Sequence, residues 1–226
     1  MTPSRGRLAV TALFRLVAGI AILAAVFVVP AGTADWWQAW AYMTILFTAV
    51  TAMFVWLLVH DPALLERRLR GVEKRGEQRL VQALGSVVYL LVFVIPGLDR
   101  RFGWSDVPAM AVVAADALVL AGYAGFAWVL RVNSWASRLV EVQQGQRAVT
   151  AGPYAFVRHP MYSAVLVMFL ATPVALGSWW ALIPALLLVP ILAARIRHEE
   201  ALLLRELEGY REYTQTRAYR LVPGLW

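Results

Sequence analysis

The chain has no cysteine, only three histidines and a single lysine, Lys74, and charged residues make up only 15% of its 226 positions. Without cysteine there is no disulfide, no thiolate metal site and no cysteine nucleophile, and the redox compartment cannot be read from the sequence. His60, His159 and His198 lack a metal-binding spacing such as HExxH, which argues against a zinc or di-iron site. There is also no strand followed by GxGxxG, no Walker A motif, no GxSxG elbow and no duplicated half, which disfavours Rossmann, P-loop, serine-hydrolase and repeat-built transporter classes.

Apolar residues dominate the chain. They account for 61% of it, with a mean hydropathy of +0.63, whereas soluble domains average about 45–50% apolar residues. A membrane-crossing helix needs about 20 mostly apolar residues, and six segments approach that length: Leu16–Val29, Trp36–Val59, Leu80–Leu98, Val107–Leu130, Met161–Leu176 and Trp179–Ala194. The first has the basic start of a secretory signal peptide, but further spans follow, so we expect it to be retained. We therefore predict an all-α polytopic membrane bundle of about six transmembrane helices.

Basic residues are distributed unevenly between the loops. Nineteen of the 21 lysines and arginines lie in the N-terminus, the second and fourth loops and the C-terminal part, and only Arg100 and Arg101 lie on the other side. The positive-inside rule then places both termini in the cytoplasm. This topology accounts for the net charge of +7, so we expect no nucleic-acid partner. The scarcity of lysine beside many arginines and alanines is typical of a GC-rich bacterium and indicates the plasma (inner) membrane.

Two polar clusters flank the hairpin formed by the last two apolar segments. The first spans 152–162 with the sequence GPYAFVRHPMY, and the second spans 195–200 with RIRHEE. A hairpin brings both clusters to the same side of the bilayer, where ionisable groups are costly unless they are paired or used. Arg195 and Glu199, four residues apart on one helix face, could form a plain ion pair or hold a substrate's carboxylate and amine. Arg158-His159-Pro160 could likewise be only a basic cap at a membrane entry.

Other segments carry weaker signals. The connector 131–157 is longer than an ordinary loop of ~4–6 residues, and long ordered connections are usually functional. Pro62–Arg70 is predicted as an interfacial helix, and Gly122 and Gly125 predict a face where another helix approaches closely. Asp116 lies inside the fourth apolar segment. It is a candidate functional residue, although a neutral structural hydrogen-bond donor or a hydrated residue near the outer face would look the same.

The polar residues together resemble a known family. Gly152-Pro-Tyr154-x-x-x-Arg158-His159-Pro160-x-Tyr162, then Arg195-Ile-x-x-Glu199-Glu200 and Gly209-Tyr210-x-x-Tyr213, is similar to the isoprenylcysteine carboxyl methyltransferase family of integral membrane enzymes. The pattern also resembles, more distantly, that of the phospholipid N-methyltransferases. The resemblance covers residues 133–226, since the first four spans match only in being apolar. It implies S-adenosylmethionine as methyl donor, with S-adenosylhomocysteine as product, and no metal.

The resemblance also implies which residues act. The cofactor-binding positions would be Gln143, Gln146, Arg147, Ala148, Val149, Tyr154, His159, Pro160, Met161, Tyr162 and Glu199. Arg195 would meet the acceptor, and His159 or Glu200 would be the base if that acceptor were an amine or a phenol. Gln146 departs from the pattern, because the eukaryotic enzymes tend to have histidine there. The tail 217–226 resembles the bacterial branch, in which the acceptor is generally unassigned.

The sequence therefore predicts two regions: residues 1–130, with the first four spans and the cytoplasmic loop 60–79, and a catalytic region 131–226 with the connector, the hairpin 160–195, and a C-terminal helix and tail. The expected activity is methyl transfer to a lipophilic acceptor that enters from the bilayer, either a carboxylate, as in isoprenylcysteine O-methylation, or a related lipid. Two alternatives remain. A sterol-reductase-like enzyme using NADPH has a similar tail of tyrosines, arginines and a proline, and a non-catalytic scaffold would use its loops only for topology. The GPY segment before RHPxY favours the methyltransferase, and Glu199-Glu200 opposite His159 argues against the scaffold.

Overall fold

The described part of the chain is entirely helical. The structure is a computed structural model that describes residues 5–69, 76–136 and 142–226, with side chains throughout these ranges except at 76–82. Its elements are α1 (Arg5–Ala31), α2 (Trp37–His60), α3 (Pro62–Leu69), α4 (Gly76–Phe102), α5 (Ala109–Val132), the single 3-10 turn η1 (Gly152–Ala155), α6 (Pro160–Ala175), α7 (Leu182–Glu206) and α8 (Tyr210–Thr216). Since these ranges contain no strand, the predicted all-α fold is confirmed.

Four of the described helices are long and apolar enough to cross a membrane: α1, α2, residues 83–102 of α4, and α5. The remaining two predicted spans correspond to helices with shorter apolar stretches. α6 has 16 residues, and α7 is apolar only before Arg195, although its helix continues to Glu206. The chain is thus a polytopic helical membrane bundle in which α6 and α7 supply the two shorter apolar segments.

Local sequence explains the bounds of the shorter helices. α6 begins at Pro160 because proline has no N–H to donate and its ring blocks a preceding helical turn. Beyond Ala175, Gly177 adopts a φ of +77°, a left-handed conformation typical of helix ends. α7 continues past the apolar segment into polar residues as far as Glu206, whereas α6 starts at Pro160 and stays within its apolar segment. α3 begins at Pro62 as predicted, and Arg70, its expected last residue, lies outside the described residues.

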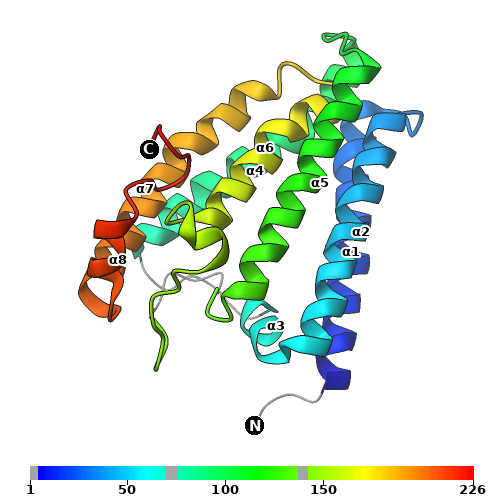
Figure 1. The fold of residues 1–226 in the computed structure, drawn as a ribbon. Coiled ribbons are helices and arrows are strands. Elements are labelled where there is room, and N and C mark those ends of the chain that lie inside the picture. The colour runs from blue at the N-terminus through cyan, green and yellow to red at the C-terminus, as the bar shows by residue number, and fades with distance from the viewer. Residues whose placement is uncertain (1–4, 70–75, 137–141) are drawn as a thin grey trace.

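The polar and apolar turns lie at opposite ends of the bundle (Figure 1). The N-terminus, α3, the connector before η1, and α8 lie at one end, while the α4–α5 and α6–α7 turns lie at the other. At that second end the Asp99 carboxylate is 2% exposed and accepts hydrogen bonds from the hydroxyls of Ser105 and Ser178. Because Asp99 ties the two turns together there, α4, α5 and the α6–α7 hairpin are fixed relative to one another.

α5 and α6 pack closely along an antiparallel pair. A Cβ atom added at Gly122 would lie 2.4 Å from the Cγ atom of Met168 and 3.1 Å from the carbonyl oxygen of Ala164. Only glycine allows this approach, as small residues do at helix interfaces in membranes. The predicted close-approach face is therefore confirmed at Gly122, and it fixes the start of α6 against the last turns of α5.

Candidate functional site

A polar pocket lies at the end of the bundle that carries α3, α8 and the connector. It encloses about 800 Å³ of space, open solvent at its mouth included. Ten of the eleven predicted cofactor-binding residues line it: Gln146, Arg147, Ala148, Val149, Tyr154, His159, Pro160, Met161, Tyr162 and Glu199. These residues come from the connector, the start of α6 and the charged end of α7, so the fold gathers the predicted set in one place.

The eleventh residue, Gln143, supports the pocket without lining it. Its backbone N–H donates to Oε1 of Gln146 at 2.9 Å, and its side-chain amide donates to the carbonyl oxygen of Trp135 at 3.1 Å. Of the three predicted catalytic residues, His159 lines the pocket, whereas Arg195 and Glu200 are not among the residues that do. The role assigned to each of these side chains stays a prediction.

Further pocket residues were not on the predicted list. They are Asn133, Trp135, Ala136, Arg158, Leu202, Leu203, Leu207, Tyr210 and Tyr213. A signal was available for some of them, because Arg158, Tyr210 and Tyr213 are part of the quoted motif and Asn133 begins the polar connector. The leucines lie on the amphipathic stretch 199–207 of α7, where their spacing alone indicates packing rather than a pocket wall.

Hydrogen bonds within the connector and from two helices, α8 and α3, hold the connector in place. The side-chain amide of Asn133 donates to the Tyr154 hydroxyl at 2.6 Å, and the Tyr213 hydroxyl on α8 donates to the Tyr154 carbonyl oxygen at 2.8 Å. On α3, the guanidinium groups of Arg67 and Arg68 donate to the carbonyl oxygens of Ser134 and Ala136, at 2.6 and 2.8 Å. The interfacial helix between the second and third spans therefore helps to hold the connector, including Ala136, which lines the pocket.

The C-terminal tail runs alongside the start of α6. Backbone N–H groups of Arg158 and His159 donate to the carbonyl oxygens of Tyr219 and Arg220, at 3.0 and 2.9 Å. One turn into α6, the Ser163 hydroxyl donates to the Leu221 carbonyl oxygen at 2.6 Å. Backbone pairing of this kind fixes the Arg158-His159-Pro160 segment independently of its side chains.

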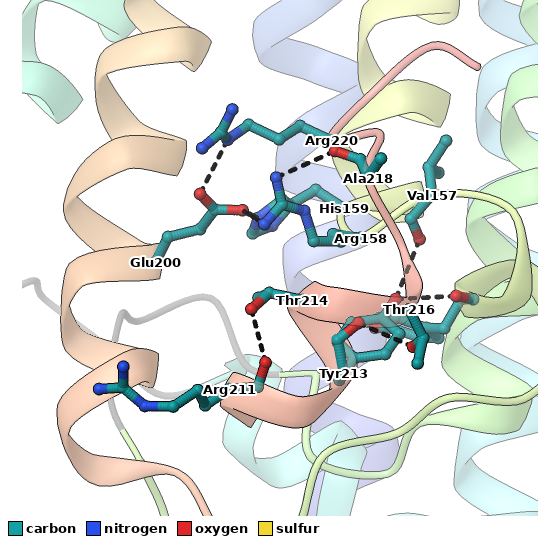
Figure 2. Close-up of polar contacts among 11 residues, drawn as sticks. Val157, Arg158, His159, Glu200, Arg211, Tyr213, Thr214, Thr216, Ala218 and Arg220 are labelled. Atoms are coloured by element: carbon teal, nitrogen blue, oxygen red, sulfur yellow. Dashed lines mark hydrogen bonds and ion pairs between the residues drawn. The ribbon is translucent and has the colours of Figure 1, made fainter. Parts of the chain in front are cut away.

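Glu200 is the centre of a buried ionic cluster (Figure 2). Its side chain is 7% exposed, and its two oxygens lie 3.2 Å from a terminal nitrogen of Arg158, 3.3 Å from Nε2 of His159 and 2.8 Å from Nε of Arg220. Burial by itself would raise the pKa of Glu200, but the hydrogen bonds from His159 and Arg220 and the charge of Arg158 outweigh it, so this pKa is lowered. Glu200 is consequently ionised at neutral pH and is a weak proton acceptor.

The nearby phenols keep their protons. Burial raises the pKa of Tyr154 to about 12 and that of Tyr213 to about 12, with smaller contributions from neighbouring charges. Both hydroxyls already take part in the hydrogen bonds that hold the connector. These tyrosines therefore support the structure of the pocket and do not serve as bases at neutral pH.

A second polar group joins α6 to α7. Nε of Arg195 donates to the Tyr162 hydroxyl at 2.8 Å, and that hydroxyl donates to Oε2 of Glu199 at 2.6 Å. The sequence suggested a two-member arrangement of Arg195 and Glu199, and the structure places Tyr162 between them. Glu199 and Tyr162 line the pocket while Arg195 lies beyond them, so this group connects the pocket to the α6–α7 interface.

Asp116 lies far from these groups. It is 7% exposed, and its Oδ1 atom has no hydrogen-bond partner among the described residues. It precedes the end of α5 by sixteen residues, which corresponds to about 24 Å at 1.5 Å per residue. Asp116 therefore does not reach the pocket. Its Oδ1 atom makes no hydrogen bond to the described residues, so this atom does not play the structural role that the sequence left open.

Fold and site together define a polytopic membrane protein with a small-molecule pocket at one end. Residues 110–208 match the model of the phospholipid methyltransferase family, a range that includes nearly all of α5 and all of η1, α6 and α7. The predicted family resemblance is confirmed over this region, and the match to the phospholipid methyltransferase family supports a membrane methyltransferase. No curated protein matches the chain.

Proposed function

We propose that this protein transfers a methyl group from S-adenosylmethionine to a lipophilic acceptor, most simply a carboxylate as in isoprenylcysteine O-methylation, or a related lipid. The observation that carries the proposal is the gathering of ten predicted cofactor residues in one pocket within the region that matches the methyltransferase family. The orientation with both termini cytoplasmic, in a plasma membrane, belongs to the same proposal.

The pocket residues fit such a cofactor. Arg158 and Tyr210 line the pocket, and each has one buried donor, Nε and the hydroxyl, without a partner among the described residues. Glu199 adds a carboxylate to the same lining. S-adenosylmethionine, when bound, supplies a methyl group on a positively charged sulfur, which reacts with an anionic or neutral nucleophile. The connector residues 146–149 and Tyr154 would hold the nucleoside portion, and His159, Pro160, Met161 and Glu199 would border the remainder.

In this proposal, Arg195 is the residue that contacts the methyl acceptor. It lies beyond the pocket wall, and its Nε atom is held by the Tyr162 hydroxyl at 2.8 Å. A guanidinium at this position can orient a carboxylate through paired N–H donors, and the acceptor would enter sideways from the bilayer. Positioning of the two reactants accounts for much of the rate gain in such transfers, up to ~7–11 kcal/mol in favourable cases, and a carboxylate acceptor needs no strong base.

An amine or phenol acceptor would require a base. The pKa of Glu200 is lowered by its hydrogen bonds with His159 and Arg220 and by the charge of Arg158, which makes Glu200 the weaker of the two predicted candidates. His159 lines the pocket and is the better placed one. A loss of turnover on an amine acceptor in His159→Gln, with no loss on a carboxylate acceptor, would assign that role.

The decisive experiment is calorimetric binding to the detergent-purified protein of S-adenosylmethionine, S-adenosylhomocysteine and NADPH. Micromolar binding of the first two, weakened in Glu199→Ala, is the expected result. Arg195→Ala should abolish turnover and leave cofactor binding intact, with Arg197→Ala as the matched control, since Arg197 is an exposed arginine on the same helix. Binding of NADPH alone would contradict the proposal and support a sterol-reductase-like enzyme. Binding of none of the three would support a non-catalytic scaffold.

A further inference from the structure

A groove runs between α2 and α5 on the outer side of the bundle. It holds about 640 Å³ of space, its open mouth included, and it shares no lining residue with the polar pocket. Four alanines line it, Ala49 and Ala52 from α2 and Ala124 and Ala127 from α5, and among its described lining residues only Arg131 is charged. Both helices are long and apolar enough to cross a membrane, so the groove lies among the acyl chains of the surrounding lipid.

The spacing of the lining residues on α5 gives the groove its direction. Ala124, Ala127 and Arg131 follow one another at intervals of three and four residues, so they share one face of the helix. Ala52 and Ala124 are exposed, and an alanine side chain ends at its Cβ atom, which lets a neighbouring chain approach the two helices closely. The groove therefore runs along the helices as an apolar channel that ends at a cation.

Arg131 is held at the end of the groove that lies toward α3 (Figure 1). Its guanidinium carbon lies 5.5 Å from the centroid of the Trp56 ring, a cation–π contact across the groove. Trp56 is itself held by His60, whose ring stacks on it at 5.0 Å and whose Nδ1 donates to the Trp56 carbonyl oxygen at 3.0 Å. Arg131 is exposed and forms no ion pair with the described residues, so its charge is available to an anion from outside the chain.

We infer that this groove binds one anionic phospholipid, with an acyl chain along the four alanines and the phosphate at Arg131. Tryptophan and arginine are the residues that anchor a protein at the boundary between acyl chains and headgroups, and a basic residue there attracts anionic lipid. A helix of another chain would cover the alanines but would leave Arg131 without a counter-charge, whereas an anionic lipid matches both parts of the groove. Phosphatidylglycerol has no amine or carboxylate to methylate, so the inference is independent of the proposed function.

The test measures the headgroup and the acyl chain separately. The detergent-purified protein is titrated with phosphatidylglycerol or with phosphatidylcholine of the same chains, and native mass spectrometry counts the bound lipids. One arginine at the membrane surface is worth enough to predict a roughly fivefold loss of affinity for the first phosphatidylglycerol in Arg131→Gln. Arg131→Lys should keep most of that affinity, and binding of phosphatidylcholine should not change. Ala52→Leu, which fills the groove from an exposed position, should weaken phosphatidylglycerol binding by a similar factor although it keeps every charge.

Two matched controls use exposed residues outside the groove, Arg197→Gln on α7 and Ala114→Leu on α5. Both should bind phosphatidylglycerol like wild type, and thermal unfolding followed by tryptophan fluorescence checks that each variant is folded. An equal loss in Arg197→Gln would reduce the effect to general surface charge and overturn the site.

Two further outcomes would assign the groove to a different occupant. Competition by glycerol 3-phosphate as strong as that by the lipid would make the ligand a free phosphate compound. A dimer of wild type in gel filtration that Ala52→Leu dissociates would make the groove a contact between two copies of the chain. An unchanged lipid affinity in Ala52→Leu would exclude the acyl chain from the groove, and with it the inference.

Discussion

Replacing Glu200 with glutamine should destabilise the protein more than any other single exchange of a carboxylate for an amide in its C-terminal part. The side chain is 7% exposed and lies within 3.3 Å of three basic groups, Arg158, His159 and Arg220. Removing one partner of a buried ionic group leaves the others desolvated without compensation, which costs about 3–5 kcal/mol. Since glutamine can still accept a hydrogen bond from Arg220, we expect a loss of about 3 kcal/mol in the free energy of unfolding.

Arg220→Gln should cost less, about 1–2 kcal/mol, because the arginine side chain is 32% exposed and water can replace part of its interaction. The double variant should show a coupling of about 1 kcal/mol, within the range for residues that share one network. Unfolding is measured in mixed micelles by titration with sodium dodecyl sulfate and tryptophan fluorescence. Glu208→Gln, an exposed change nearby, should stay within about 0.5 kcal/mol of wild type. A Glu200→Gln variant as stable as Glu208→Gln, or the absence of coupling to Arg220, would refute this account of the cluster.

Three further predictions follow from the same structure. Because the pKa of Glu200 is lowered on folding from its ordinary 4.5, the ionised Glu200 stabilises the folded state above pH ~4.5, and this stabilisation is lost as the pH falls below that value. Unfolding titrations at several pH values should therefore show a free energy of unfolding that decreases with falling pH in wild type, and a smaller decrease in Glu200→Gln. Gly122→Val should destabilise by about 1–3 kcal/mol through overpacking against Met168, whereas Gly125→Ala, whose new Cβ would lie 3.6 Å from the Ala164 Cβ atom, should be tolerated; the same unfolding assay compares them. Tyr162→Phe removes the hydroxyl between Arg195 and Glu199 and should reduce kcat/KM by roughly 10- to 100-fold; steady-state kinetics that match wild type would exclude a role for that link.

Much of the candidate site could be predicted from the sequence because it is carried by short, contiguous segments. Two polar clusters on either side of an apolar hairpin must end at the same side of the bilayer, whatever the details of packing. The connector residues 146–149 and the segment 159–162 were predicted as a set and line one pocket. Arg195 and Glu199 were predicted to share a helix face, and α7 does continue through both of them to Glu206.

The structure added partners that lie far away in the sequence. Arg220 reaches Glu200 because the tail turns back along the start of α6, and nothing in the spacing of residues 207–226 predicts that path. Arg67 and Arg68 looked like topology signals in a basic loop, yet they donate to carbonyl oxygens of the connector. The family resemblance implied that Gln143 binds the cofactor, whereas its side-chain amide donates to the Trp135 carbonyl oxygen within the connector.

By itself, the sequence determined that this is a helical membrane protein, which segments are apolar, and that its ionisable groups gather at one end. Those properties follow from composition and local periodicity, which act over a few residues. Only the tertiary structure decided that Glu200 contacts Arg158, His159 and Arg220, that Tyr162 joins Arg195 to Glu199, and that Arg158 and Tyr210 line the pocket. Such contacts depend on where a tail and a connector are fixed in space by many weak interactions at once, and no short stretch of residues encodes that position.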